Sequence, residues 1–102
     1  MSFHKTEDLI MPQVFKIGSY WVYFWANDNK PLEPVHVHIA KVKPTANATK
    51  FWITKSGKCL LANNSSDYDS KTLNYLSKAI EANYSIVIDK WLSFFGEITY
   101  FC

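Results

Sequence analysis

Arginine is absent from this sequence of 102 residues: all eleven basic residues are lysines, and the formal net charge is only +2. Arginine is the residue best suited to bidentate contacts with phosphate and guanine, so its absence argues against a typical nucleic-acid-binding protein. The three glycines form no phosphate-binding loop, and neither a serine elbow nor a His-Glu-x-x-His motif occurs. These absences argue against the familiar nucleotide-dependent enzymes.

Cysteine is scarce, and long apolar runs are missing. Cys59 and Cys102 are too few for a disulfide framework, and their spacing fits no zinc motif. The longest apolar run, near residue 20, is too short to span a membrane, and the polar N-terminus is unlike a signal peptide. We therefore expect a cytoplasmic protein without a membrane segment.

Large apolar side chains are abundant. The chain is 48% hydrophobic, 17% aromatic and only 20% charged, which is typical of a globular domain. Its length suits one domain with one modest core. We assign residues 1–10 to an N-terminal extension and residues 11–102 to a single domain. So many large rings exceed what a small core encloses, and some are expected at a surface or interface.

The first two thirds of the domain alternate apolar and polar residues with a period of two, which predicts strands. Gly18-Ser19 and Ser56-Gly57 interrupt this pattern and predict hairpin turns. The expected strands are residues 13–17, 20–26, 35–42, 48–54 and 58–62. We therefore expect about five short strands in a mostly antiparallel sheet.

The last third has helical periodicity. Asp69 or Ser70 can cap a helix start, and apolar residues then recur at spacings of three and four. The residues of this first stripe are Leu73, Leu76, Ile80 and Tyr84. A second stripe, formed by Ile88, Trp91, Leu92 and Phe95, ends at Gly96, although its β-branched start is also compatible with a strand. Residues 97–102 alternate again and predict an added edge strand. The fold class is therefore α+β, with two C-terminal helices packed on one face of the sheet.

His36 and His38 lie two residues apart in the third expected strand, so both rings should project from one face into an accessible hollow. Three interpretations remain open. The pair can be the polar face of a strand. It can bind a divalent metal with Asp28 or Glu33 as third ligand, although no cofactor is required by the sequence. It can also divide acid and base roles in RNA cleavage.

In the RNA-cleavage interpretation a lysine stabilises the charge on the phosphorane, and Lys50 is the candidate, with Lys41 or Lys55 as alternatives. A separate candidate site is aromatic. Its residues are Trp21, Tyr23, Trp25 and Trp52. With neighbouring lysines these rings can stack on bases, anchor a partner protein, or form core beneath the helices.

Several stretches together resemble the small bacterial domain of unknown function 4160 family. They are MPQVFKIGSYWVYFW at 11–25, EPVHVHI at 33–39, ATKFWIT at 48–54 and the late W..FFG at 91–96. Family members commonly carry proline where Val35 stands. The resemblance implies a small bacterial cytosolic or mobile-element protein whose gene often adjoins that of a second small uncharacterised protein, a pairing for which a toxin–antitoxin role has been suggested. It also implies that His36 and His38 are the hallmark of the family, with no catalytic role established for them.

We therefore expect a cytosolic bacterial protein that binds a small partner protein, as one component of a toxin–antitoxin-like pair. The alternative is a histidine-dependent ribonuclease or metal-dependent hydrolase that uses His36 and His38. A nucleic-acid-binding module is the third interpretation, and a homo-oligomer is compatible with all three.

Overall fold

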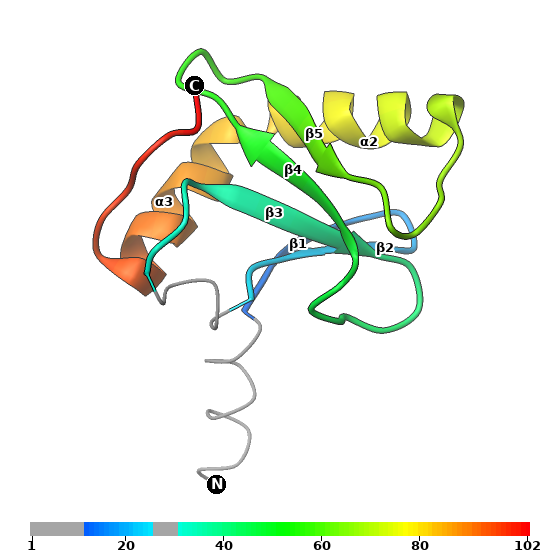
Figure 1. Ribbon diagram of the computed structural model, residues 1–102, viewed down its shortest axis with the longest axis horizontal. Coiled ribbons are helices and arrows are strands. Elements are labelled where there is room, and N and C mark those ends of the chain that lie inside the picture. The colour runs from blue at the N-terminus through cyan, green and yellow to red at the C-terminus, as the bar shows by residue number, and fades with distance from the viewer. Residues whose placement is uncertain (1–11, 26–30) are drawn as a thin grey trace, which may run out of the picture.

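The computed structural model of the protein describes residues 12–25 and 31–102, and it consists of one sheet followed by two helices (Figure 1). The expected extension at residues 1–10 and the candidate ligand Asp28 lie outside the described residues. The strands are β1 (Gln13–Ile17), β2 (Tyr20–Tyr23), β3 (His36–Ala40), β4 (Thr49–Ile53) and β5 (Cys59–Asn63). The helices are α2 (Ser70–Ala82) and α3 (Tyr84–Phe95).

The sheet has the order β1-β2-β3-β4-β5, and each neighbouring pair is antiparallel. Glycine makes the two tight turns that the sequence predicts. Gly18 and Gly57 have φ angles of +58° and +84°, a region of backbone conformation that residues other than glycine rarely adopt. The five-stranded antiparallel sheet and the α+β class are confirmed.

The helix ends follow the predicted capping residues. The side chain of Asp69 accepts a hydrogen bond of 2.8 Å from the backbone N–H of Thr72, which satisfies a free donor in the first turn of α2. Gly96 ends α3 in the left-handed region, at φ +82°, and its N–H donates to the carbonyl of Leu92. The β-branched start of α3 is helical, and Tyr84 opens this helix instead of closing α2.

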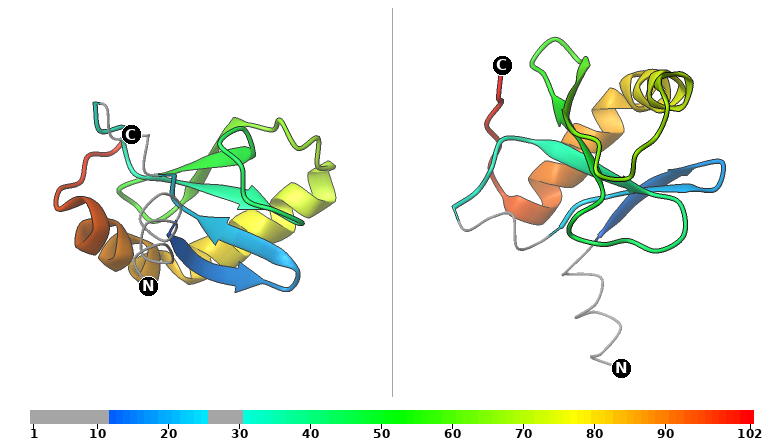
Figure 2. Two further views of the ribbon diagram at one scale, coloured as in Figure 1. Left: turned by 90° about the horizontal axis from the view of Figure 1, so that it is seen from below. Right: turned by 45° about the vertical axis from the view of Figure 1, so that its right-hand side comes forward.

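The core lies between the helices and one face of the sheet (Figure 2). Val22, Val37, Ile39 and Phe51 occupy that face, because alternate residues of a strand point to the same side. The helices cover them with Leu76, Ile80, Val87 and Trp91, all of which are buried. Within the described part of the chain, no helix is both long and apolar enough to cross a membrane.

The predicted edge strand at residues 97–102 is wrong. This tail has no strand structure and instead runs past the ends of two strands on the α3 side of the molecule (Figure 1). The N–H of Val35, just before β3, donates to the carbonyl of Thr99 at 2.9 Å. The N–H of Lys55, just after β4, donates to the carbonyl of Cys102 at 3.1 Å. Because the tail crosses strand ends, it forms isolated hydrogen bonds and no ladder.

Candidate functional site

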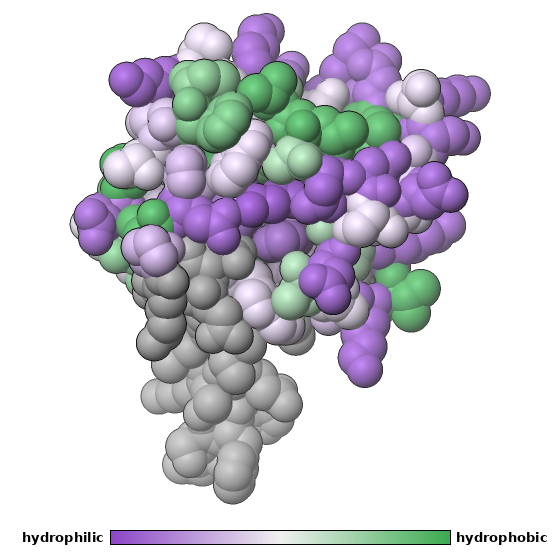
Figure 3. Space-filling view, viewed as in Figure 1, coloured by the Kyte–Doolittle hydropathy of each residue, from purple (hydrophilic) through white to green (hydrophobic). Residues whose placement is uncertain are grey.

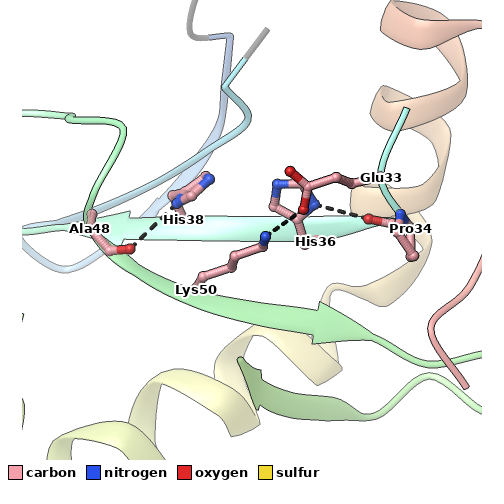
Figure 4. Close-up of polar contacts among 6 residues, drawn as sticks. All are labelled: Glu33, Pro34, His36, His38, Ala48 and Lys50. Atoms are coloured by element: carbon pink, nitrogen blue, oxygen red, sulfur yellow. Dashed lines mark hydrogen bonds and ion pairs between the residues drawn. The ribbon is translucent and has the colours of Figure 1, made fainter. Parts of the chain in front are cut away.

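The two histidines project from the same side of β3 (Figure 4), away from the side of Val37 and Ile39. Antiparallel register places Trp52 and Lys50 of β4 beside His36 and His38, respectively. On the other side, Tyr23 of β2 is the partner of His38. The extended conformation and the shared direction of the two rings are as predicted. The strand pairing thus assembles a layer of histidine, aromatic and lysine side chains.

His36 is enclosed by aromatic rings. Its side chain is 0% exposed and lies edge-on to Trp52 and Trp91, with ring centroids 5.6 and 5.4 Å away. Its Nδ1 is 2.9 Å from the carbonyl oxygen of Pro34. A carbonyl can only accept, so Nδ1 carries the proton and the lone pair of a neutral ring is on Nε2.

His38 is buried as well, at 3% exposed, and stacks on Tyr23 at a centroid distance of 5.6 Å. Its Nδ1 donates a longer hydrogen bond, 3.4 Å, to the carbonyl of Ala48. The two imidazole centroids are 5.1 Å apart with their planes nearly perpendicular. The expected accessible hollow is therefore wrong: both rings project together, but into a closed layer with polar backbone partners.

The acidic candidate Glu33 has a different partner from the one predicted. Its carboxylate Oε1 is 2.5 Å from the Nζ of Lys50, an ion pair that bridges the loop before β3 to β4 (Figure 4). Among residues 12–25 and 31–102, no three His, Cys, Asp or Glu side chains are grouped so that they can hold a metal ion. In this structure Glu33 is thus paired with Lys50 and is not grouped with His36 and His38.

Lys50 lies next to the histidines, as its predicted role requires. Its Nζ is 4.3 Å from the ring centroid of Trp52, a cation–π contact, in addition to the ion pair with Glu33. The ammonium is thus already balanced by a carboxylate. A role for Lys50 in stabilising negative charge stays a prediction, and it requires that Glu33 give up this ion pair.

Tyr23, one of the four predicted binding rings, belongs to the interior. Its side chain is fully buried, and its hydroxyl donates to the carbonyl of Thr45 at 2.6 Å while accepting from the Thr45 N–H at 2.9 Å. Tyr23 therefore holds the loop between β3 and β4, and the expectation that its ring is a surface anchor is wrong. Trp21, Trp25 and Trp52 are each half-buried.

An exposed apolar surface adjoins the histidine layer, and the sequence did not reveal it. Phe101 of the tail stacks on Trp52, with ring centroids 5.0 Å apart and planes inclined by only 5°. Leu60, the β5 partner of Trp52, lies beside the stack. Phe101 is 56% exposed and Leu60 42% exposed. We call Trp52, Leu60 and Phe101 the aromatic surface. Hydrophobic residues are prominent at the top of the view in Figure 3, where β4, β5 and the C-terminus lie.

The model of a protein family described as Domain of unknown function (DUF4160) matches residues 19–92. The chain belongs to the DUF4160 family. No curated protein and no solved structure matches the chain. The DUF4160 match includes both histidines, Lys50, Trp52 and Trp91, whereas Phe101 lies outside it. The aromatic surface therefore combines two side chains of the family domain, Trp52 and Leu60, with one side chain of the tail, Phe101.

Proposed function

We propose that this DUF4160 protein binds a small partner protein through the aromatic surface, as one component of a toxin–antitoxin-like pair in the bacterial cytoplasm. The observation that carries the proposal is the exposed Trp52–Phe101 stack beside Leu60. Large rings at the centre of an apolar patch with a polar rim are the typical anchors of protein interfaces. The Lys50–Glu33 ion pair supplies such a rim.

The charge around the aromatic surface favours a protein over a nucleic acid. Lys50 is the cation in contact with Trp52, and Glu33 neutralises it. The net charge of +2 and the lack of arginine provide little attraction for phosphates. Both cysteines are free thiols, which agrees with a reducing compartment.

The surroundings of the histidines support a structural role over an enzymatic one. A general acid or base must reach the proton that it transfers, directly or through one water. His36 and His38 are buried, and each uses Nδ1 to hold a backbone carbonyl at one end of β3 or β4. Their side chains are therefore best suited to stabilising the interior beneath Trp52 and the aromatic surface.

The test uses the product of the neighbouring gene as the probe. The two full-length proteins are mixed, and the dissociation constant is measured by calorimetry for the wild type, Phe101→Ala and Tyr75→Ala. Tyr75 is the matched control, because it is an aromatic residue with nearly the same exposure, 54%, on α2. Removing an anchor ring should weaken binding by at least about tenfold, and the control should leave it unchanged.

Failure to form a complex, or equal affinity of wild type and Phe101→Ala, would overturn the proposal. The enzymatic alternative is tested in parallel by an RNA-cleavage assay of wild type, His36→Ala and His38→Ala. Cleavage by the wild type that both variants lose, while remaining folded, would replace partner binding with catalysis as the function of this site.

A further inference from the structure

Strand β5 is an open edge of the sheet with no charge and no proline between Cys59 and Asn63. Its consecutive residues Leu60 and Leu61 are 42% and 43% exposed and point to opposite sides. Proteins normally protect such an edge with lysine, proline, a bulge or a covering segment, because its free backbone groups can pair with another strand. An uncharged, apolar edge is suited to a specific strand partner.

The opposite edge, β1, has that protection. The Nζ of Lys90 in α3 donates to the carbonyl of Val14 at 2.8 Å, so one backbone acceptor of the edge is already used. Lys16 is exposed on the same strand, whereas β5 has no charged residue. The pairing is irregular near both edges, between Gln13 and Phe15 for β1 with β2 and between Lys50 and Phe51 for β4 with β5. The difference in charge between the two edges therefore favours β5 as the edge available for pairing.

The backbone of β5 offers hydrogen-bonding groups at this edge. The N–H of Cys59 points away from β4 and already donates to the carboxylate of Glu81 at 2.8 Å, so this donor is used, as the Val14 acceptor is at β1. Outward-facing residues alternate along an antiparallel strand, so the N–H and C=O of Leu61 also point away from β4. Leu61 is therefore the position at which a further strand can exchange a pair of hydrogen bonds.

The charges beside β5 favour a second copy of the chain in antiparallel orientation. Exposed Lys55 and Lys58 precede the strand, and exposed Asp67 and Asp69 follow it. A two-fold arrangement places the start of one β5 beside the end of the other, so that opposite charges meet. A parallel arrangement would instead bring like charges together.

We propose that two copies of the chain pair through β5 around a two-fold axis at Leu61, joining their sheets into one. A groove of about 330 Å³ between β5 and α2 can accommodate apolar side chains on the helix side of the new ladder. The groove contains no charged residue. Its lining residues are Phe51, Cys59, Leu61, Ser70, Leu73, Asn74 and Ser77. In this dimer the Leu61 side chains of both copies lie opposite each other at the mouths of the two grooves.

The experiment is the measurement of solution mass by sedimentation equilibrium, at full length and at several hundred micromolar. The wild type should have twice the monomer mass of 11.8 kDa. Leu61→Lys and Leu61→Glu, each alone, should be monomeric with unchanged circular dichroism, because like charges then face each other. An equimolar mixture of the two variants should recover dimers, because lysine then faces glutamate. Leu92→Lys is the control, since Leu92 is 40% exposed on α3, and it should remain dimeric.

A monomeric wild type, two dimeric Leu61 variants, or a mixture that stays monomeric would each overturn the β5 dimer. These outcomes are separate from the test of partner binding, which depends on Phe101. The dimer goes beyond the proposed function and does not depend on it.

Discussion

The substitution His36→Ala distinguishes a structural histidine from an accessible one. The His36 ring has no exposed surface, donates to the Pro34 carbonyl at 2.9 Å, and packs against Trp52 and Trp91. Alanine removes the donor and the ring together. We therefore expect the free energy of unfolding to fall markedly, even though no apolar core residue is changed.

Two contributions set the size of this loss. The part-buried hydrogen bond to Pro34 is worth about 1–2 kcal/mol, because the carbonyl loses its donor. The missing ring leaves a space of about 60 Å³, which costs about 1.5 kcal/mol at about 24 cal/mol per Å³. The sum is about 3 kcal/mol, a large fraction of the roughly 5–15 kcal/mol that stabilises a small domain.

The assay is urea unfolding followed by tryptophan fluorescence, with two further variants at the same position. His36→Asn keeps an N–H donor near the backbone and should recover the hydrogen-bond contribution. His36→Leu restores most of the volume and should recover the packing contribution. Both variants should unfold at urea concentrations between those of His36→Ala and the wild type. If His36→Ala unfolds at the same urea concentration as the wild type, the His36 ring does not stabilise the fold and the reasoning is refuted.

Three further predictions concern single groups. Burial, with a smaller effect from Glu81, raises the pKa of Cys59 to about 12, so at pH 8 its thiolate fraction is about a thousandfold below that of an ordinary thiol. Iodoacetamide should therefore label the exposed Cys102 first, and equal labelling rates in the folded protein would contradict this. Hydrogen bonds from Thr72 lower the pKa of Asp69, so its stabilisation is present above the ordinary value of 3.8 and is lost as pH falls through the lowered pKa. Asp69→Ala should thus lower the melting temperature at neutral pH. A difference in melting temperature between wild type and variant that stays the same in acid would count against the role of Asp69 as a helix cap. Gly96→Ala should cost about 1 kcal/mol in chemical unfolding, because φ is +82° although a Cβ there meets no atom within 4 Å; an unchanged midpoint would contradict the strain.

The elements of the fold were predictable because their signals are local. Period-two alternation marks the strands, Gly18 and Gly57 mark the turns, and Asp69 and Gly96 mark helix ends. Each of these depends on the conformational preferences of a few adjacent residues. The direction of the two histidine side chains was predictable for the same reason, since it follows from strand geometry alone.

What closes the histidine layer is not local. Trp91 reaches His36 from a helix more than fifty residues further along the chain, and no periodicity specifies that contact. The Glu33–Lys50 ion pair likewise depends on the register between β3 and β4. The tail was misread because its alternation predicts a strand, whereas its position across the strand ends is set by hydrogen bonds to Val35 and Lys55.

The two proposed surfaces meet on adjacent residues of β5 without overlapping. Leu60 lies beside Trp52 on the aromatic surface, whereas Leu61 points into the groove beside α2. Consecutive side chains of a strand project to opposite faces, so a partner on the aromatic surface and a second copy at the edge approach β5 from different directions. Leu60→Ala should therefore weaken partner binding and leave the solution mass unchanged, whereas Leu61→Lys should have the reverse effect. One short uncharged strand can thus serve two interfaces, and this is a reason for its apolar sequence that core packing does not provide.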